Sequence, residues 1–526
     1  MDTTPLYLVG ALLLSTLLFL FLFSGRRRNL LLPPTISGAV PILGHLHLII
    51  GARRRHQPLH HALAALSADH GPILLLRFGS RQVLYISSPS AAEDCLTIND
   101  ITFSNRPHLL AGKYLNFDNS SLATASYSPH WRNLRRIAAA ELFSSARIQS
   151  LANFRAEGIR SLLSSLLSAA AAVNGTAEWS QVEMKRKFKM LTFSTIMRIL
   201  DGRKYCGEEN TANSEMGERM MRMTDEGLSL SDASSLEDFV PWMGWLGIAG
   251  GTKRRMIRLG KEMNEIFQEM VDERRRRRTV KAVAAGADKT IVDVMLALQE
   301  QDPENYSDKI IKGMISAIII AGTETTAGLM EWALSLLLNH PKTLQKARDE
   351  IDSHIGGGGG HGRRLITDSD LPHLPHLQNI IKETLRLFPP GPLLLPHQSS
   401  ADCTVAGYTI PSGTMLLINA YAIHRDPALW KDAGSFMPER FAEGEGEGFH
   451  FLPFGWGRRR CPGEGLAYRL MGLAVGALIQ CFEWKRVNGE ETVDLTEGPG
   501  LSMPKLVPLE ALYKPREVML PVLSQL

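Results

Sequence analysis

Cysteine is scarce in this sequence. Its 526 residues include only five cysteines, an odd number without close spacing. A disulfide framework uses paired cysteines, and zinc and iron–sulfur sites need several clustered ligands, so the sequence disfavours all three. The scattered thiols indicate a reducing compartment. The five are Cys95, Cys206, Cys403, Cys461 and Cys481.

A strong excess of either charge is also missing. Lys and Arg total 58 and Asp and Glu total 54, which leaves a net charge of +4. A dedicated nucleic-acid binder would carry more clustered positive charge, so we expect no nucleic-acid partner. The sequence also lacks a low-complexity linker after residue 60. Its length would suit about three average domains, but residues 60–526 are predicted to form one large domain.

Only the N-terminus departs from a globular composition. Residues 6–23 are uncharged and almost wholly apolar, close to the ~17–20 residues that a helix needs to cross a bilayer. Three arginines follow at 26–28, and the positive-inside rule places the C-terminal side in the cytoplasm. A cleaved signal peptide is the alternative, but the basic residues before the apolar run and the small-residue cleavage site are missing. Residues 1–28 are predicted to be a retained transmembrane anchor.

The remaining chain is predicted to be mostly helical. Residues 29–59 contain Pro33, Pro34 and Pro41 and are expected to form a stiff hinge and linker. Helices are expected at 60–69, from 130, through much of 151–278 with breaks near 175 and at 241–251, at 308–339, around 383–386 and at 465–481. Short strands are expected at 73–78 and 82–86, joined by the turn Gly79–Ser80, and at 403–410 and 414–419. Residues 104–128 show little periodicity and are predicted to be a long loop.

Residues 454–463, Phe-Gly-Trp-Gly-Arg-Arg-Arg-Cys-Pro-Gly, form the stretch with the clearest chemistry. Glycines on each side of Cys461 let the backbone pass close to a flat cofactor and adopt positive φ. The three arginines and the N-terminus of the following helix favour the thiolate, which is the form that binds metal. Free backbone N–H groups at that helix start can point at the sulfur. One thiolate without partner ligands suits haem iron; a buried thiol in a glycine-rich turn is the alternative.

The whole string resembles the haem-binding loop of the cytochromes P-450, the haem-thiolate monooxygenases. The family pattern F-x-x-G-x-R-x-C-x-G falls on Phe454, Gly457, Arg459, Cys461 and Gly463. The resemblance implies haem b as the cofactor, with Cys461 as the axial iron ligand and the other residues around it. It also implies a mainly α fold, with a large helical domain and a small β-rich lobe.

Another motif of this family opens the helix predicted from residue 130. Trp131 and Arg135 stand four residues apart and share one helical face. In the family this pair meets a haem propionate, which suits a fixed cation and an indole N–H donor. A surface helix with an arginine stacked on tryptophan is the alternative. The resemblance assigns His397 to the cofactor as well.

The helix predicted at 308–339 is apolar all round in its middle and is expected to run through the core. It carries Ala-Gly-Thr-Glu-Thr-Thr at 321–326, where small Ala321 and Gly322 leave room for a ligand beside the helix. A carboxylate and hydroxyls are costly in a buried helix unless they work or pair. The segment matches the family's oxygen-activation motif, which implies that Glu324 and Thr325 deliver protons. For Thr325 the alternative is a hydroxyl that only bonds back to the carbonyl four residues earlier.

A third motif is an ion pair at i,i+3, Glu383 and Arg386, which alone is common and uninformative. Arg440 lies downstream in Pro-Glu-Arg-Phe. The family closes Glu383, Arg386 and Arg440 into a buried triad that braces the cysteine loop.

Several segments are most similar to the plant A-type branch that includes isoflavone 2'- and 3'-hydroxylases; they are residues 377–383, 396–400, 421–427 and 500–505. Residues 126–129, Ser-Tyr-Ser-Pro, differ from the Pro-Tyr-Gly-Asp expected of that branch in a substrate-facing loop. Residues that face the haem in the family are expected to line an apolar pocket for flat aromatic substrates. They are Leu109, Leu115, Phe117, Ile318, Leu393, Leu394 and Leu501.

The activity implied by the resemblance is insertion of one oxygen atom from O₂ into an apolar, aromatic or phenolic plant metabolite such as a flavonoid, isoflavonoid or lignan. NADPH electrons would arrive through NADPH–cytochrome P-450 reductase, and the protein would be a single-pass endoplasmic-reticulum protein with its catalytic domain in the cytosol. One alternative is a haem-thiolate isomerase or dehydratase, although such relatives usually have a disrupted acid–threonine pair. The other is a non-catalytic, membrane-anchored haem-binding protein, in which Glu324 and Thr325 would have no purpose.

Overall fold

The computed structural model describes residues 31–173, 178–205, 212–232, 236–244, 250–281, 289–356, 363–442, 448–489 and 491–526, with Ser15, Thr16, Gly444 and Gly446. The predicted anchor at 1–28 lies outside the described residues apart from Ser15 and Thr16, as do Cys206 and the break near residue 175. Among the described residues, one helix, α14 (Asp308–Asn339), is long and apolar enough to cross a membrane. Most of α14 is buried inside the protein, as expected of a core helix.

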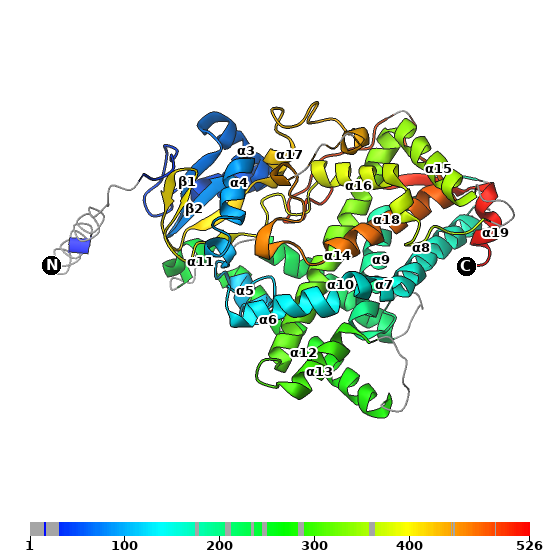
Figure 1. The fold of residues 1–526 in the computed structure, drawn as a ribbon, viewed down its shortest axis with the longest axis horizontal. Helices are drawn as coiled ribbons and strands as arrows, with labels where there is room; N and C mark the ends of the chain where they lie inside the picture. Colours follow the sequence, from blue (N-terminus) through cyan, green and yellow to red (C-terminus); the bar gives the residue numbers. More distant parts are fainter. Residues whose placement is uncertain are drawn as a thin grey trace, which may run out of the picture.

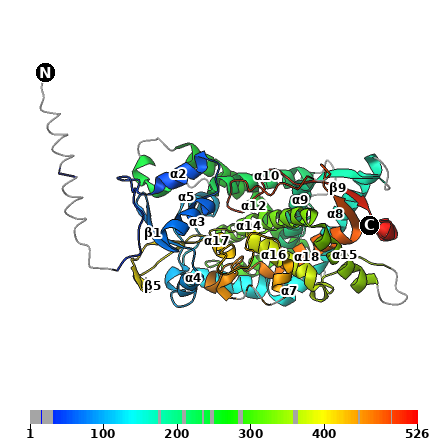
Figure 2. The same cartoon turned by 90° about the horizontal axis from the view of Figure 1, so that it is seen from above.

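Helices dominate the described chain, as predicted. Figure 1 shows an elongated molecule with β1, β2 and α3 towards one end and α8, α15 and α19 at the other, and Figure 2 agrees. The helices before α14 are α2 (Leu46–Arg54), α3 (Leu59–His70), α4 (Pro89–Leu96), α5 (Leu110–Leu115), α6 (Pro129–Ile137), α7 (Ser145–Ser150), α8 (Ala152–Val173), α9 (Met184–Asp201), α10 (Ala212–Asp232), α11 (Leu236–Phe239), α12 (Gly250–Lys281) and α13 (Ile291–Gln301). Those after it are α15 (Pro341–Gly356), α16 (Pro375–Leu387), α17 (Ala420–His424), α18 (Glu464–Cys481) and α19 (Leu520–Leu523).

The main sheet has four strands in the order β1-β2-β7-β4. Its strands are β1 (Ile73–Phe78), β2 (Arg81–Ile86), β4 (His397–Gln398) and β7 (Met415–Ile418). The predicted hairpin is confirmed, because β1 and β2 pair antiparallel with Phe78 opposite Arg81. Gly79 in the turn has φ +58°, and a Cβ atom there would lie 2.1 Å from the Phe239 carbonyl oxygen. Only glycine fits such a turn.

Two smaller sheets complete the β structure. The strands β3 (Ser180–Glu183), β9 (Glu510–Pro515) and β8 (Phe482–Lys485) form one sheet, in the order β3-β9-β8. The stretch 403–410 is a hairpin of β5 (Cys403–Val405) and β6 (Tyr408–Ile410), which turns at Ala406 and Gly407. Strand β3 interrupts the region that sequence periodicity predicted to be helical. The partner of β3 is β9, which comes from a distant part of the chain, so the local sequence around β3 does not predict a strand.

The two segments predicted to lack regular structure are both partly ordered into helices. The predicted loop at 104–128 contains the short helix α5. The predicted linker at 29–59 contains α2, and its Ile36, Leu46 and Ile49 are buried in one apolar cluster with β1 and β2. From residue 31 onward this segment therefore packs on the main sheet.

Helix α14 is the central element of the helical part, and its predicted bounds are confirmed. Gly322 marks its close approach to α9, because a Cβ at Gly322 would lie 2.7 Å from Cδ1 of Ile196. This corrects the expectation that Gly322 leaves room for a ligand, since Ile196 fills that space. Further along, the Trp332 indole stacks on Phe388 with 3.8 Å between ring centroids. These contacts fix α14 in the core, so that side chains on its open face hold defined positions.

Candidate active site

The cysteine loop is a tight turn held by its own backbone. Gly455 and Gly457 have φ of +67° and +68°, as predicted, whereas Gly463 on the other side of Cys461 has φ −84°. A Cβ on Gly457 would lie 2.6 Å from the Leu96 carbonyl oxygen, so the loop passes directly over the end of α4. The Cys461 N–H donates to the Phe454 carbonyl oxygen at 2.9 Å, which closes the turn. The side chain of Cys461 is thereby held at the start of α18.

The Cys461 thiol is exposed on one side and surrounded by protein on the others. Burial raises the pKa of this thiol, while backbone N–H groups of Gly463 and Glu464 and the charge of Arg135 lower it. Donors at the helix start thus favour the thiolate, as predicted, but burial outweighs them in the protein alone. A bound metal ion would supply the missing positive charge, because coordination deprotonates a thiol.

The three arginines of the loop do not act together on the sulfur. The Arg458 guanidinium donates to Asp100 at 2.8 Å, and Arg460 donates to Glu464 at 2.8 Å. Arg459 points away into the protein, where it has no carboxylate partner among the described residues. The cation that favours the Cys461 thiolate from outside the loop is Arg135 on α6. The expectation that the loop arginines favour the thiolate is therefore confirmed only for Arg460, whose charge is attracted to Cys461, whereas Arg458 and Arg459 bond elsewhere.

Arg459 lies between the indole of α6 and a ring of backbone carbonyls. Its guanidinium carbon lies 4.2 Å from the centroid of the Trp131 ring, a stacked cation–π contact. Its N–H groups donate to Ser104 at 2.5 and 2.8 Å, to Ala125 at 2.5 Å and to Leu122 at 3.2 Å. The arginine stacked on Trp131 is thus Arg459 of the cysteine loop, while Arg135 takes a different role.

A second arginine, Arg106, is buried in the same region and was missed by the sequence motifs. Its guanidinium donates to the carbonyl oxygens of Leu395 and Pro396, each at 2.7 Å, and to that of Ala123 at 3.2 Å. Burial lowers the pKa of Arg106 to about 10. Its partners span nearly three hundred residues, so no short motif could have identified it.

The charges in this region call for an anion. Burial, together with the like charges of Arg106 and Arg135, lowers the pKa of Arg459 to about 8, against the weaker opposing effect of Asp100. Guanidinium groups stay charged at neutral pH, so these cations repel one another. An anionic group placed among them would relieve that repulsion and gain charge-assisted hydrogen bonds. Two haem propionates have this chemistry.

His397 and Trp131 already bond to the backbone. The Nδ1 atom of His397 lies 2.7 Å from the Phe103 carbonyl oxygen, and burial followed by the charge of Arg106 lowers the pKa of this imidazole well below its usual value. His397 is therefore neutral, and Nδ1–H donates to Phe103. The Trp131 indole N–H donates to the Leu122 carbonyl oxygen at 3.1 Å. In this structure that N–H is thus used within the protein.

The predicted triad is present and fully buried. Arg386 donates to the two carboxylate oxygens of Glu383 at 2.7 and 2.8 Å, and Arg440 donates to the same carboxylate at 3.1 Å. Arg386 also donates to the carbonyl oxygens of His424 and Ala433 at 2.6 and 2.7 Å. A buried carboxylate paired in this way keeps its charge satisfied.

His424 connects this triad to the cysteine loop, and no sequence motif pointed to it. Its Nδ1 atom lies 3.2 Å from the Arg386 carbonyl oxygen, and its Nε2 atom accepts the Leu452 N–H at 2.8 Å. Leu452 in turn accepts the N–H of Gly455 at 3.0 Å. The bracing role implied by the family resemblance therefore has a path of hydrogen bonds through His424.

The acid–threonine pair lies on an accessible face of α14. Ala321 is exposed and Glu324 and Thr325 are partly exposed, although most of the helix is buried. The Thr325 hydroxyl donates to the Ala321 carbonyl oxygen at 2.5 Å. Glu324 lies 3.8 Å from the ammonium of Lys189 on α9, a partner that sequence reasoning missed. Accessible polar groups in the middle of a core helix need a ligand or solvent to face.

The residues expected to line the substrate pocket fall into several environments. Leu115 and Ile318 are buried in one apolar cluster, with Phe117 packed against it. Leu393 and Leu394 pack against the two clusters that contain the main sheet, whereas Leu501 is 43% exposed. Leu109 is partly buried at the start of α5.

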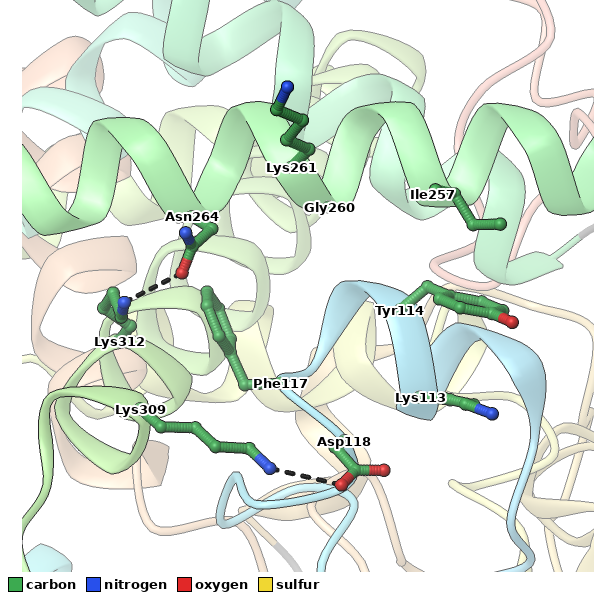
Figure 3. A pocket seen from close by; sticks show the side chains of 10 residues that line it. All are labelled: Lys113, Tyr114, Phe117, Asp118, Ile257, Gly260, Lys261, Asn264, Lys309 and Lys312. Atoms are coloured by element: carbon green, nitrogen blue, oxygen red, sulfur yellow. Dashed lines mark hydrogen bonds and ion pairs between the residues drawn. The ribbon is translucent and has the colours of Figure 1, made fainter.

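Phe117 also lines an open pocket of about 440 Å³ between α5, α12 and α14. Figure 3 shows its ring beside Asn264 of α12 and Lys312 of α14, which are joined by a hydrogen bond. The ring centroid lies 6.0 Å from the Lys312 ammonium and 6.2 Å from the Phe267 ring. This pocket is partly charged, because Lys113, Asp118, Lys261, Lys309 and Lys312 are among the residues that line it.

These residues fit a haem. One cysteine at a helix start can supply a single thiolate ligand, and the cluster of Arg106, Arg135 and Arg459 can receive the propionates. The accessible face of α14 provides a surface against which a flat cofactor can lie. Among the described residues, Cys461 belongs to no cluster of three or more potential metal ligands, and a single thiolate is suited to haem iron.

Comparison with known proteins identifies relatives over the whole chain. A protein from Catharanthus roseus, "Cytochrome P450 81Q32", is 44% identical over 525 residues and covers 100% of this chain and 99% of its own. The "(+)-piperitol/(+)-sesamin synthase CYP81Q2" of Sesamum radiatum is 43% identical, covering 94% of this chain and 92% of its own. An "Isoflavone 3'-hydroxylase" of Medicago truncatula is 42% identical, covering 92% and 91%.

The fold has a counterpart among solved structures. A zebra fish cytochrome P450 solved with progesterone superposes with a TM-score of 0.73 at 25% identity, over 87% of this chain and 100% of that one. The family model described as "Cytochrome P450" matches residues 33–508. This chain therefore belongs to the cytochrome P450 family, and it is a haem-thiolate monooxygenase that binds haem b.

Proposed function

We propose that this chain is a membrane-anchored monooxygenase that acts on an apolar, aromatic or phenolic plant metabolite of the flavonoid, isoflavonoid or lignan type. Residues 1–28 hold it in the endoplasmic-reticulum membrane, and residues 29–59 connect that anchor to the cytosolic domain at 60–526. NADPH–cytochrome P-450 reductase supplies the electrons. The intact acid–threonine pair on the accessible face of α14 carries the proposal, because a haem-binding protein without oxygen chemistry would not need it.

When bound, haem iron supplies the binding and reductive cleavage of O₂. Cys461 holds the iron as a thiolate, with the N–H groups of Gly463 and Glu464 towards its sulfur. Arg106, Arg135 and Arg459 fix the propionate side of the group. The residues of this chain thereby set the position of the substrate relative to the reacting oxygen.

Protons reach the site along α14. The Thr325 hydroxyl donates to the Ala321 carbonyl oxygen, which leaves its own oxygen free to accept a hydrogen bond from water. Glu324 lies beside Lys189, which also contacts the half-exposed Asp225 of α10. We propose that solvent protons pass through this charged group to Glu324 and then, through water, to the site beside Thr325.

Support for the substrate class comes from two relatives at over 40% identity, one named as a sesamin synthase and one as an isoflavone hydroxylase. Leu115, Phe117 and Ile318, which lie together in one apolar region, agree with an apolar substrate. Binding spectra with isoflavones and furofuran lignans test the class. An obligate, highly charged substrate would contradict it.

Oxygen consumption tests the activity itself. Microsomes that contain the protein and the reductase should consume O₂ in an NADPH-dependent way with at least one compound of a phenolic panel, and form an oxygenated product. An isomerase or dehydratase would convert its substrate without NADPH or O₂. A carrier would bind haem without turnover.

Membrane topology is tested separately. Protease added to sealed microsomes should digest the catalytic domain, since the positive-inside rule places it in the cytosol. Protection of the whole chain would reverse the topology and rule out the reductase as partner. A variant that lacks residues 1–28 should become extractable by salt without detergent.

A further inference from the structure

Three potential metal ligands meet outside the cysteine loop. His60 and His61 lie in the first turn of α3, and Glu497 lies in the segment between β8 and β9. The Nε2 atom of His60 is 2.9 Å from one carboxylate oxygen of Glu497, and the Nε2 atom of His61 is 3.0 Å from the other. The three ligand atoms all lie within 4.8 Å of one another.

Hydrogen bonding explains only one of the two contacts between these histidines and Glu497. His61 is aligned for a hydrogen bond to Glu497. By contrast, His60 Nε2 and the nearer Glu497 oxygen are both buried and lack any hydrogen-bond partner, although they are 2.9 Å apart. Buried polar atoms without a partner are costly, and each such pair requires an explanation. A cation bound by both atoms would satisfy them without the alignment that a proton needs.

The protonation states suit a cation. Burial lowers the pKa of His60, so its imidazole is neutral, which is the form that binds metal. Burial raises the pKa of Glu497, but the close contacts of its carboxylate with His60 and His61 outweigh burial and lower this pKa below its usual value, so the carboxylate is charged. The side chain of His61 is 34% exposed and opens the cluster to solvent. Metal can therefore enter from outside.

The surroundings hold the ligands in place. The Tyr421 ring lies 4.8 Å from the His60 ring and stacks on the His61 ring at 4.5 Å. Arg425 is a nearby positive charge. Its guanidinium lies 4.4 Å from the centroid of the Tyr421 ring, and this cation–π contact stabilises the charge. Rings fixed by stacking present their nitrogens in defined directions.

We propose that His60, His61 and Glu497 bind one divalent transition-metal ion of the zinc type. Two imidazole nitrogens and one carboxylate are typical zinc ligands, and such three-ligand sites keep a fourth position for water. The ion joins α3, near the start of the domain, to the segment just before β9, near its end. Because the ligands come together only in the folded chain, metal binding stabilises the fold.

The experiment uses the full-length protein with its haem in detergent micelles. Dialysis against EDTA removes loosely held divalent metal and leaves haem in place, and zinc is then added back. We expect one zinc per chain by elemental analysis and a higher unfolding temperature. The substitutions His61→Ala and Glu497→Gln should weaken binding by roughly tenfold or more and abolish the temperature shift.

A matched control is available on the same helix. His70 is exposed at the end of α3, outside the cluster, so His70→Ala should bind zinc like the parent protein. The haem absorption of each variant reports whether it is folded. If Glu497→Gln unfolds, the zinc affinity of His61→Ala tests the proposal, because that substitution removes only a partly exposed ring. Unchanged zinc affinity in His61→Ala, or no zinc bound by the parent at micromolar concentration, would overturn the proposal.

Discussion

The Nε2 atom of His424 accepts a hydrogen bond from the backbone N–H of Leu452 at 2.8 Å, in the interior of the protein. His424 is completely buried and also contacts the carbonyl oxygen of Arg386 through Nδ1. It thus joins the Glu383–Arg386–Arg440 triad to the chain that enters the cysteine loop. This bond requires a neutral imidazole, because a protonated Nε2 cannot accept.

The first prediction concerns acid stability. Burial, followed by the charge of Arg386, lowers the pKa of His424 to about 3, from 6.5 for an ordinary histidine. Between these values the unfolded chain binds the proton and the folded chain does not, so the free energy of unfolding falls as pH falls from about 6.5 towards 3. The contribution of this one group is at most about 1.4 kcal/mol per pH unit.

The variant His424→Gln removes this proton and keeps an acceptor near Leu452. Denaturant titrations at several pH values should show a shallower pH dependence than the parent, by about one proton. His70→Gln, at an exposed position, is the control. Equal slopes in the parent and His424→Gln would contradict the prediction.

The second prediction separates two glycines that the family pattern treats alike. Gly457 has φ +68°, and a Cβ there would collide with Leu96 and Asp100, whereas a Cβ on Gly463 would lie 3.9 Å from Cys461 Sγ without a positive φ. Gly457→Ala should therefore destabilise the protein by roughly 2 kcal/mol or more and lower haem content. Gly463→Ala should keep both near the parent. Haem per chain and thermal unfolding measure the difference.

The third prediction concerns the iron ligand. Cys461→Ala should abolish the carbonyl-complex absorption band that is characteristic of a reduced haem thiolate, because Cys461 is the thiol at the start of α18 beside Arg135. Cys481 is buried at the end of α18, where burial raises its pKa to about 12. Cys481→Ala should keep the band. Persistence of the band in Cys461→Ala would show that the ligand is a different residue.

The fourth prediction concerns proton delivery. Thr325→Val keeps the shape of the side chain and removes the hydroxyl that bonds to Ala321. Haem content and substrate binding should persist, while much of the NADPH consumed ends as hydrogen peroxide instead of product. If the hydroxyl only bonds back to the helix, coupling of NADPH to product stays near that of the parent.

The same assay tests the partner of Glu324. Lys189→Met removes the ammonium 3.8 Å from the Glu324 carboxylate and keeps the apolar length of the side chain. Turnover should slow and its solvent isotope effect should rise. An unchanged isotope effect would exclude Lys189 from the proton route.

The fifth prediction concerns Arg106. Its substitution by Met removes the donor from three partly buried carbonyl oxygens, at a cost of roughly 2–4 kcal/mol. Haem occupancy should fall as well, since one cation of the cluster is lost. Arg106→Lys restores the charge without the planar fork and should recover part of the occupancy and less of the stability.

The helices and strands that have a clear local sequence pattern were predicted correctly. The apolar run of α14 and the one of α18 gave helix bounds within a residue of those observed. Gly79 and the alternation around it identified the first hairpin. In each case the deciding signal lies within a few residues of the element itself.

What the sequence did not reveal depends on distant segments. Arg106, Lys189 and His424 are defined by partners between 17 and 290 residues away. Gly322 suggested space beside α14, but Ile196 from another helix fills it. Neither a short motif nor a hydrophobic periodicity shows these contacts, because they form only when distant segments pack together.

Strand β9, residues 510–515, pairs with β3 on one side and with β8 on the other. It is synthesised long after β3 (Ser180–Glu183), so this sheet cannot form until residues 510–515 have left the ribosome. Helices α8 and α9 are synthesised much earlier, and β3 between them stays unpaired until β9 has been made. A nascent or truncated chain that ends before residue 510 therefore exposes a strand edge, and this makes it a substrate for chaperones and for degradation.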